Sequence, residues 1–314
     1  MNNQTQSTSK LIFTALFCCL LWGSAPVLIK TGYEAFQVSG TPSILLFAGL
    51  RFILAGLMVL IFAFGSSRKS GSDVRSSGFL KAVFALAMFQ TFGQYSLYYI
   101  GVANTSGVIA SILSGVSAFF ALAISSWIYH LEKMTPLKAF SCLLGFLGIL
   151  IMNLKGFQLS FSFSGEGVLL LSQICSAESA VLIKIFSRKQ DPVLLSGFQF
   201  LLGGLLLSLC GFFSGGHLQF SLSGLWILLM LGFVSAGAYT LWGVLLSEYP
   251  VSKVGIFTCT IPLFGVLFSI LFLKEYDAFN FSTLTALLLI GFGIYLLNAP
   301  GKSRIQRNSE SSDQ

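Results

Sequence analysis

Long apolar runs recur along almost the whole chain and constrain its fold more than any other feature. A helix needs about 20 apolar residues to cross the hydrocarbon layer of a bilayer. Membrane strands would instead be shorter segments of about ten residues with alternating apolar and polar side chains. We therefore expect an all-α integral membrane protein with ten transmembrane helices, at residues 11–30, 42–64, 79–100, 104–128, 136–153, 164–186, 193–213, 223–247, 251–273 and 279–298.

The composition excludes an ordinary soluble domain. Hydrophobic residues make up 55% of the chain and charged residues only 9%, whereas soluble domains carry about 25% charged residues. The first run could in principle be a cleaved secretory signal, because Lys10 precedes it and Ser24 and Ala25 lie near its end. We favour a membrane helix, since the run is long for a signal and Pro26 is poorly placed for cleavage.

The positions of the basic residues predict the orientation of the chain. Thirteen of them fall at the two termini or in every second loop, against two, Lys155 and Lys274, in the intervening loops. Cytoplasmic loops are enriched in Lys and Arg, so both termini should be cytoplasmic, as an even number of crossings requires. The net charge of +7 therefore indicates a lipid bilayer and no nucleic acid as partner. We expect a multi-pass protein of the cell (plasma or inner) membrane.

Two halves of the chain resemble each other. Val-Leu-Ile-Lys stands at residues 27–30 and again at 181–184. Further matches follow in the same order, and they pair Arg51 with Gln199 and Tyr95 with Tyr239. Because a unit of five helices reverses its direction, the two copies should be inverted repeats, a pattern typical of transporters. The expected divisions are a cytoplasmic segment (1–10), repeat 1 (11–153), a linker (154–163), repeat 2 (164–298) and a disordered cytoplasmic tail (299–314).

Several short motifs resemble the EamA-type branch of the drug/metabolite transporter superfamily. They are Leu21–Pro26 leading to Lys30, Leu50–Phe52, Ile261–Phe264 and Leu273–Glu275. The resemblance spans roughly residues 11–298, although Ser114–Phe119 lacks a proline comparable to Pro262.

This resemblance implies a secondary active transporter that moves a small organic metabolite by alternating access, with export as the expected direction. An amino acid-like, aromatic or drug-like solute is implied, because intramembrane charges are few and aromatic residues are many. The alternatives are a uniporter or exchanger for a metabolite such as S-adenosylmethionine, or a channel-like facilitator.

The residues give little basis for an enzyme, a cofactor or a metal site. The chain has two histidines, and its six cysteines lie inside predicted spans without the spacing of metal ligands. It contains no G-x-x-x-x-G-K-[ST] loop to bind nucleotide phosphates. We expect no catalysis, no cofactor and no metal, and a small-molecule substrate with a proton as candidate coupling ion.

Ionisable residues inside the predicted spans are costly in a bilayer and therefore call for a reason. Glu178 could couple transport to protons, or recognise a cation, from a central cavity; the alternative is a structural pair with a base such as Arg51. For Arg51 a packing or gate role is expected, because the resemblance places the second helix away from the cavity. Lys30 and Lys184 should extend to opposite membrane faces as structural or gate residues.

Polar and aromatic residues complete the candidate site. Gln90, Gln94 and Tyr98 recur every four residues and should share a helix face, although single tyrosines could belong to an interfacial belt. Prolines in spans permit bending, or mark static kinks. The candidate substrate-binding or coupling residues are Trp22, Ser24, Pro26, Gln90, Gln94, Tyr95, Tyr98, Glu178, Tyr239, Trp242, Thr258 and Pro262.

Overall fold

The computed structural model describes residues 2–65, 73–131, 133–152, 154–155, 158–159, 161–248, 256–276 and 280–298. The tail expected at 299–314 lies outside the described residues. So do six of the thirteen basic residues counted at the termini and in every second loop: Arg68, Lys69, Lys253, Lys302, Arg304 and Arg307.

Helices make up nearly all of the described chain, which confirms the prediction of an all-helical protein. The first half contains α1 (Asn2–Ala35), α2 (Gly40–Gly65), α3 (Ser77–Leu86), the π-helix η1 (Ala87–Gly93), α4 (Gln94–Ala103), α5 (Gly107–Ser114), α6 (Ser117–Ala123), the π-helix η2 (Ile124–Ile128) and α7 (Pro136–Met152). A two-residue antiparallel pair, β1 (Leu154–Lys155) with β2 (Gln158–Leu159), follows. The second half contains the π-helix η3 (Phe163–Gly167), α8 (Val168–Phe186), α9 (Pro192–Phe213), α10 (Leu222–Glu248), the 3-10 helix η4 (Ile256–Thr260), α12 (Ile261–Leu273) and α13 (Phe281–Asn298).

Six helical stretches among the described residues are long and apolar enough to cross a membrane: Leu11–Ala35, Gly40–Gly65, Gly107–Ile128, Phe163–Phe186, Pro192–Phe213 and Leu222–Trp242. Three shorter apolar helices are Pro136–Ile151, Ile261–Leu273 and Phe281–Leu296. Each of these overlaps one of the predicted runs. The run predicted at 79–100 corresponds to α3, η1 and α4, which continue one another and enclose a π-helical turn.

Polar side chains fix where several helices begin. The hydroxyls of Ser76 and Ser106 accept hydrogen bonds from backbone N–H groups in the first turns of α3 and α5. Asp191 does the same for α9, whose first residue is Pro192. These are the residue types that satisfy the free N–H groups of a helix start.

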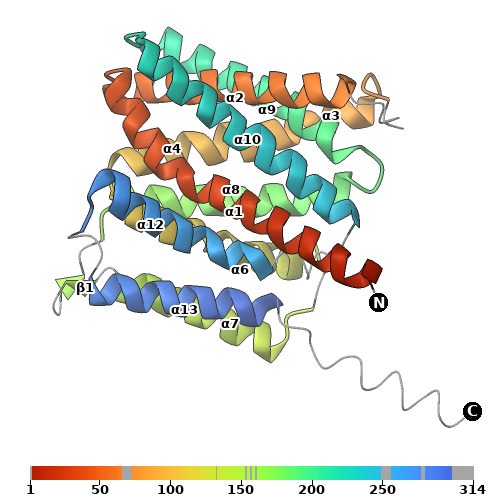
Figure 1. Ribbon diagram of the computed structural model, residues 1–314, viewed down its shortest axis with the longest axis vertical. Coiled ribbons are helices and arrows are strands. Elements are labelled where there is room, and N and C mark those ends of the chain that lie inside the picture. The colour runs from red at the N-terminus through yellow and green to blue at the C-terminus, as the bar shows by residue number, and fades with distance from the viewer. Residues whose placement is uncertain are drawn as a thin grey trace, which may run out of the picture.

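The helices lie side by side in a stack (Figure 1). One edge is formed by α2 packed against α9, and the opposite edge by α7 packed against α13. Between these edges, α1 contacts α10 and α12, while α8 contacts α4 and α6. The middle of the stack is therefore built from helices of both halves.

Glycines allow α2 and α9 to approach closely. A Cβ atom on Gly204 would lie 2.7 Å from the backbone nitrogen of Ile53 and 2.9 Å from the carbonyl oxygen of Gly49. A Cβ atom on Gly56 would lie 2.9 Å from the carbonyl oxygen of Gly197. Small residues at such crossings are typical of membrane helix pairs.

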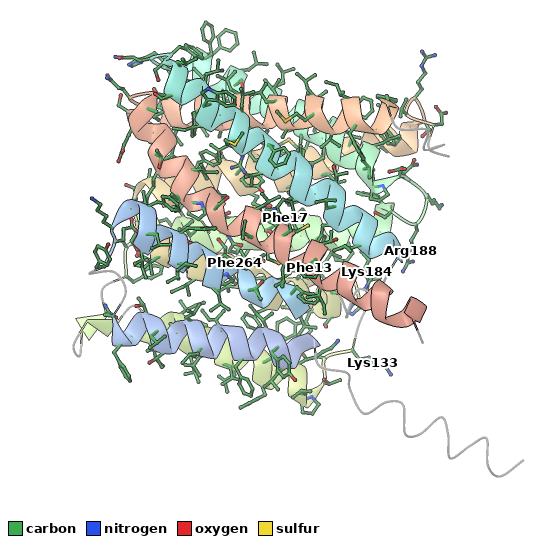
Figure 2. All side chains as sticks on the ribbon, in the orientation of Figure 1. Phe13, Phe17, Lys133, Lys184, Arg188 and Phe264 are labelled. Atoms are coloured by element: carbon green, nitrogen blue, oxygen red, sulfur yellow. The ribbon has the colours of Figure 1, made fainter. Side chains whose placement is uncertain are left out.

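The outer surface and one end of the stack carry different side chains. Large apolar groups such as Phe13, which is 75% exposed, cover the sides of the helices. Figure 2 shows Lys133, Lys184 and Arg188 at the end of the molecule where α1 begins. This distribution suits a bilayer around the helices and an aqueous phase at that end.

Candidate functional site

A cavity of about 310 Å³ lies between the helices, and we call it the central cavity. Its lining comes from α1, α2, α4, α5, α6, α8, α10, η4 and α12. Seven of the predicted site residues line it: Trp22, Gln94, Tyr95, Tyr98, Tyr239, Trp242 and Thr258. The structure thus brings residues from both halves of the chain to one space.

Aromatic rings form one wall of the central cavity. Trp22 contacts Tyr239 and Trp242 edge to face, with ring centroids 5.6 and 5.1 Å apart. The phenol oxygens of Tyr95 and Tyr239 lie 3.4 Å apart. Aromatic groups with polar tips can hold a planar or amphipathic solute while offering hydrogen bonds to it.

Polar groups complete the lining. The Tyr98 and Ser114 hydroxyls lie 3.2 Å apart, and Gln173 and Ser176 of α8 also line the cavity. The side-chain oxygen of Gln94 is buried and has no hydrogen-bond partner among the described residues. Such an unpaired acceptor costs free energy, unless a ligand supplies a donor.

Arg51 also lines the central cavity, contrary to the expectation that its helix lies away from it. Its Nε donates to the Leu231 carbonyl oxygen (3.2 Å), Nη1 to the Tyr99 hydroxyl (2.7 Å) and Nη2 to the Ser235 hydroxyl (2.9 Å). These bonds hold the guanidinium between α2, α4 and α10. Tyr99 is fully buried, so it does not belong to an interfacial belt.

Five of the predicted site residues do not line the central cavity: Ser24, Pro26, Gln90, Glu178 and Pro262. The Ser24 hydroxyl donates to the carbonyl oxygen of Leu21 within its own helix. The Gln90 side-chain oxygen accepts a bond of 3.1 Å from the Gln199 side chain. Pro262 packs beside Gly115, where an added Cβ would lie 3.0 Å from the proline ring.

Glu178 differs most from its expected position, because it does not face the central cavity. Its carboxylate accepts a hydrogen bond from the Tyr129 hydroxyl, which follows η2. This bond, together with burial, raises the pKa of Tyr129 to about 12. Neighbouring residues of α8, Gln173, Ser176 and Ala177, line the cavity instead.

The two lysines of the repeated tetrapeptide lie in different surroundings. Lys30 forms an ion pair with Glu275, with 3.2 Å between Nζ and Oε1. The second oxygen of Glu275 accepts a bond of 3.1 Å from the backbone nitrogen of Val108 in α5. Lys184 lies at the other end of the molecule, where α1 begins (Figure 2).

Sequence reasoning missed Arg51, Ser114, Gln173 and Ser176 as cavity residues. Gln173 and Ser176 lie on the same helix as Glu178. Their polar side chains in an apolar span could have indicated a site residue, as the carboxylate of Glu178 did. The part of the chain that the structure describes contains no cluster of three His, Cys, Asp or Glu side chains able to hold a metal ion.

Apolar helices around a cavity lined by aromatic and polar side chains define a class of multi-pass membrane proteins that admit small solutes. The model of the EamA-like transporter family matches residues 9–154 and again residues 163–299. The chain therefore belongs to this family, which confirms the resemblance drawn from the short motifs. It is a transporter of the cell membrane, and its family indicates transport rather than catalysis.

Several curated proteins are similar over most of their length. The uncharacterized transporter YvbV of Bacillus subtilis (strain 168) is 28% identical over 265 residues, which is 83% of this chain and 84% of that protein. The uncharacterized transporter sll0355 of Synechocystis sp. is 26% identical over 334 residues, or 98% of this chain and 95% of that protein. The WAT1-related protein At3g02690, chloroplastic, of Arabidopsis thaliana is 26% identical over 296 residues, or 89% and 67%.

A solved structure, described only as the crystal structure of a protein, shares the fold. It superposes with a TM-score of 0.64 at 17% sequence identity, covering 92% of this chain and 95% of that chain. This likeness shows that the helical arrangement exists in another protein over nearly its full length.

Proposed function

We propose that this transporter moves a small organic metabolite by alternating access between two inverted five-helix repeats, residues 11–153 and 164–298. The observation that carries the proposal is the central cavity, because Tyr95 of the first half and Tyr239 of the second meet at its wall. A solute site between two inverted repeats is the arrangement expected of a secondary transporter.

Helix packing supports the inverted repeat. Residues 49 and 56 of α2 correspond to residues 197 and 204 of α9 in the repeat alignment. In the structure Gly49 approaches Gly204, and Gly56 approaches Gly197, as a twofold axis between the halves requires. The pairs α1 with α10 and α8 with α4 are related by the same exchange. The family match to each half agrees with this division.

Charge supports the proposed orientation. Lys133, Lys184 and Arg188 lie at the end where α1 begins, and the positive-inside rule makes this end cytoplasmic. The ion pair of Lys30 with Glu275 then belongs to the outer end. Export is the expected direction, and a proton is the proposed coupling ion.

Reconstitution into liposomes tests the proposed function. Liposomes that contain the purified protein are loaded with labelled aromatic and amino acid-like metabolites. The protein should carry a saturable flux of these solutes, and unlabelled substrate on the opposite side should stimulate that flux. Conduction far above transporter rates, without this stimulation, would indicate a channel. Comparing inward with outward flux gives the direction of transport. Comparing flux with and without a pH gradient shows whether a proton is the coupling ion.

Trp242→Ala should weaken apparent substrate affinity about tenfold, because it removes a large ring from the cavity wall. The measurement is the substrate concentration that gives half-maximal flux in liposomes. Trp226→Ala is the matched control, since Trp226 lies on the same helix and is 59% exposed. Equal affinities for the two variants would show that the aromatic wall does not contact the solute.

Glu178→Gln should leave the protein folded and remove the pH dependence of transport, because glutamine cannot exchange a proton. The measurement is flux across a range of pH, with Glu34→Gln as a control at an exposed carboxylate. Tyr129→Phe removes the hydroxyl that donates to Glu178 but keeps the carboxyl group, so its flux should remain pH-dependent. An unchanged profile in Glu178→Gln would exclude the coupling role.

A further inference from the structure

Arg51 carries a positive charge that the described protein does not neutralise. The side chain is 2% exposed and lies within Gly40–Gly65, a helix able to span the membrane. Its partners are a carbonyl oxygen, two hydroxyls and the rings of Phe52, Tyr95 and Tyr99, all of them neutral. An ionised group in a membrane interior is normally paired with an opposite charge or marks a substrate pathway.

Hydrogen bonds hold the guanidinium in place, but they do not use all of its N–H donors. Arginine has five N–H donors, and three of them bond to Leu231, Tyr99 and Ser235. One N–H on each terminal nitrogen is left without a partner among the described residues. Arginine forks bind carboxylates through two such donors. Because three bonds already hold the side chain, little further ordering is needed to receive an anion.

A second unpaired group lies on the same cavity. The Gln94 side-chain oxygen is buried and lacks a donor, and Gln94 lines the central cavity together with Arg51. A ligand that satisfies both groups carries an anionic acceptor and a separate hydrogen-bond donor. The aromatic wall of Trp22, Tyr95 and Tyr239 accommodates an apolar ring.

The net charge of the lining selects among such ligands. Among the described residues that line the cavity there is one base, Arg51, and no Asp or Glu. A monoanion neutralises this charge, whereas a zwitterion leaves the site with its positive charge and a cation adds another.

We propose that the central cavity binds an organic monoanion, with a carboxylate on Arg51, a hydroxyl or similar donor on the Gln94 oxygen, and an apolar ring against the aromatic wall. The proposal deepens the transport function, on which it rests, by naming the charge and class of the solute. The preferred solute is an aromatic hydroxy acid rather than an amino acid or an amine.

Three probes that share a phenyl ring and differ in charge test this assignment. They are 3-phenyllactate (negative), phenylalanine (zwitterionic) and 2-phenylethylamine (positive). In purified protein, 3-phenyllactate should raise the unfolding temperature and bind at least about tenfold more tightly than the other two, the loss expected when a charge-assisted pair is absent. Equal or tighter binding of phenylalanine or the amine, or no binding of any probe, would overturn the proposal.

Substitutions of Arg51 and Gln94 test whether these residues make the proposed contacts with the anion. Arg51→Gln should remove the preference for the anion, whereas Arg188→Gln, the same change at an exposed site, should keep it. Gln94→Ala should weaken the binding of 3-phenyllactate but not that of 3-phenylpropionate, which lacks the hydroxyl. An Arg51→Gln variant that keeps the preference would contradict the assignment. If that variant does not fold, the charge series on the unmodified protein and the Gln94 comparison decide.

Flux measurements separate this proposal from the transport proposal. Binding of 3-phenyllactate without flux of any solute would contradict transport while supporting the anion site. Saturable flux of neutral or cationic solutes, without 3-phenyllactate binding, would support transport and overturn the anion site.

Discussion

Gly204→Val is expected to prevent most of the protein from reaching its folded state in the membrane. A side chain at this position would meet the backbone of α2, since a Cβ atom alone would lie 2.7 Å from the Ile53 nitrogen and 2.9 Å from the Gly49 carbonyl oxygen. Backbone atoms cannot rotate away as a side chain can, so α2 and α9 must separate. Overpacking costs about 1–3 kcal/mol and occasionally more.

The measurement is the yield of monodisperse protein after detergent extraction, together with its unfolding temperature. Gly291→Val is the matched control, because Gly291 also lies inside a helix and an added Cβ would meet nothing within 4 Å. Both variants replace a glycine inside a helix with valine, so the difference between them in yield and unfolding temperature reports the α2–α9 crossing. Equal yields and unfolding temperatures would show that this crossing is not a determinant of the fold.

The sequence predicted the existence of the helices better than their internal form. The ends of α2 and α9, Gly40–Gly65 and Pro192–Phe213, lie close to the predicted runs at 42–64 and 193–213, because apolar length alone defines a membrane span. The π-helical turn at Ala87–Gly93 was not predicted. Apolar composition does not distinguish an i+5 hydrogen-bonding pattern from an i+4 pattern.

This turn explains why one predicted site residue, Gln90, does not line the central cavity. Gln90, Gln94 and Tyr98 share a face in a regular α-helix, but Gln90 lies in η1 and bonds to Gln199 of α9. Gln94 and Tyr98 follow the turn and line the central cavity. The wider turn changes the direction of residues before it relative to those after it.

Helix rotation explains the positions of Arg51 and Glu178. Arg51 reaches the central cavity, and Glu178 turns instead toward Tyr129. In an apolar span every face is hydrophobic enough to meet lipid or protein, so periodicity indicates weakly which face turns inward. Packing of α2 against α4 and α10, and of α8 against η2, decides it, and this information lies in residues far apart in the sequence.

The ion pair of Lys30 with Glu275 joins three elements at the proposed outer end. Lys30 lies in α1, Glu275 follows α12, and the second Glu275 oxygen accepts from Val108 of α5. Both side chains are mostly buried, with exposed fractions of 23% and 16%. In the proposed alternating-access cycle, opening of this end would separate α1 from α12 or α5, so the carboxylate should stabilise the closed arrangement.

Glu275→Gln is accordingly expected to shift the protein toward states open to the outside and to slow transport. Weakening this ion pair by roughly 1.4 kcal/mol corresponds to a tenfold change in the ratio of open to closed states. Accessibility is measured with a membrane-impermeant maleimide on Ala25→Cys, a cavity position, after replacement of the six native cysteines. Labelling from outside should be faster in Glu275→Gln, while Lys81→Gln, an exposed lysine, serves as control.

Exchange of the two charges separates an ion-pair latch from a general loss of structure. Lys30→Glu alone should open the outer end, because two carboxylates then repel each other. Combining it with Glu275→Lys restores the attraction but not the bond to Val108, since a lysine accepts no hydrogen bond. Labelling and flux should therefore recover in part. A double variant as open and as slow as Lys30→Glu would show that the bond to α5, rather than the ion pair, closes the outer end.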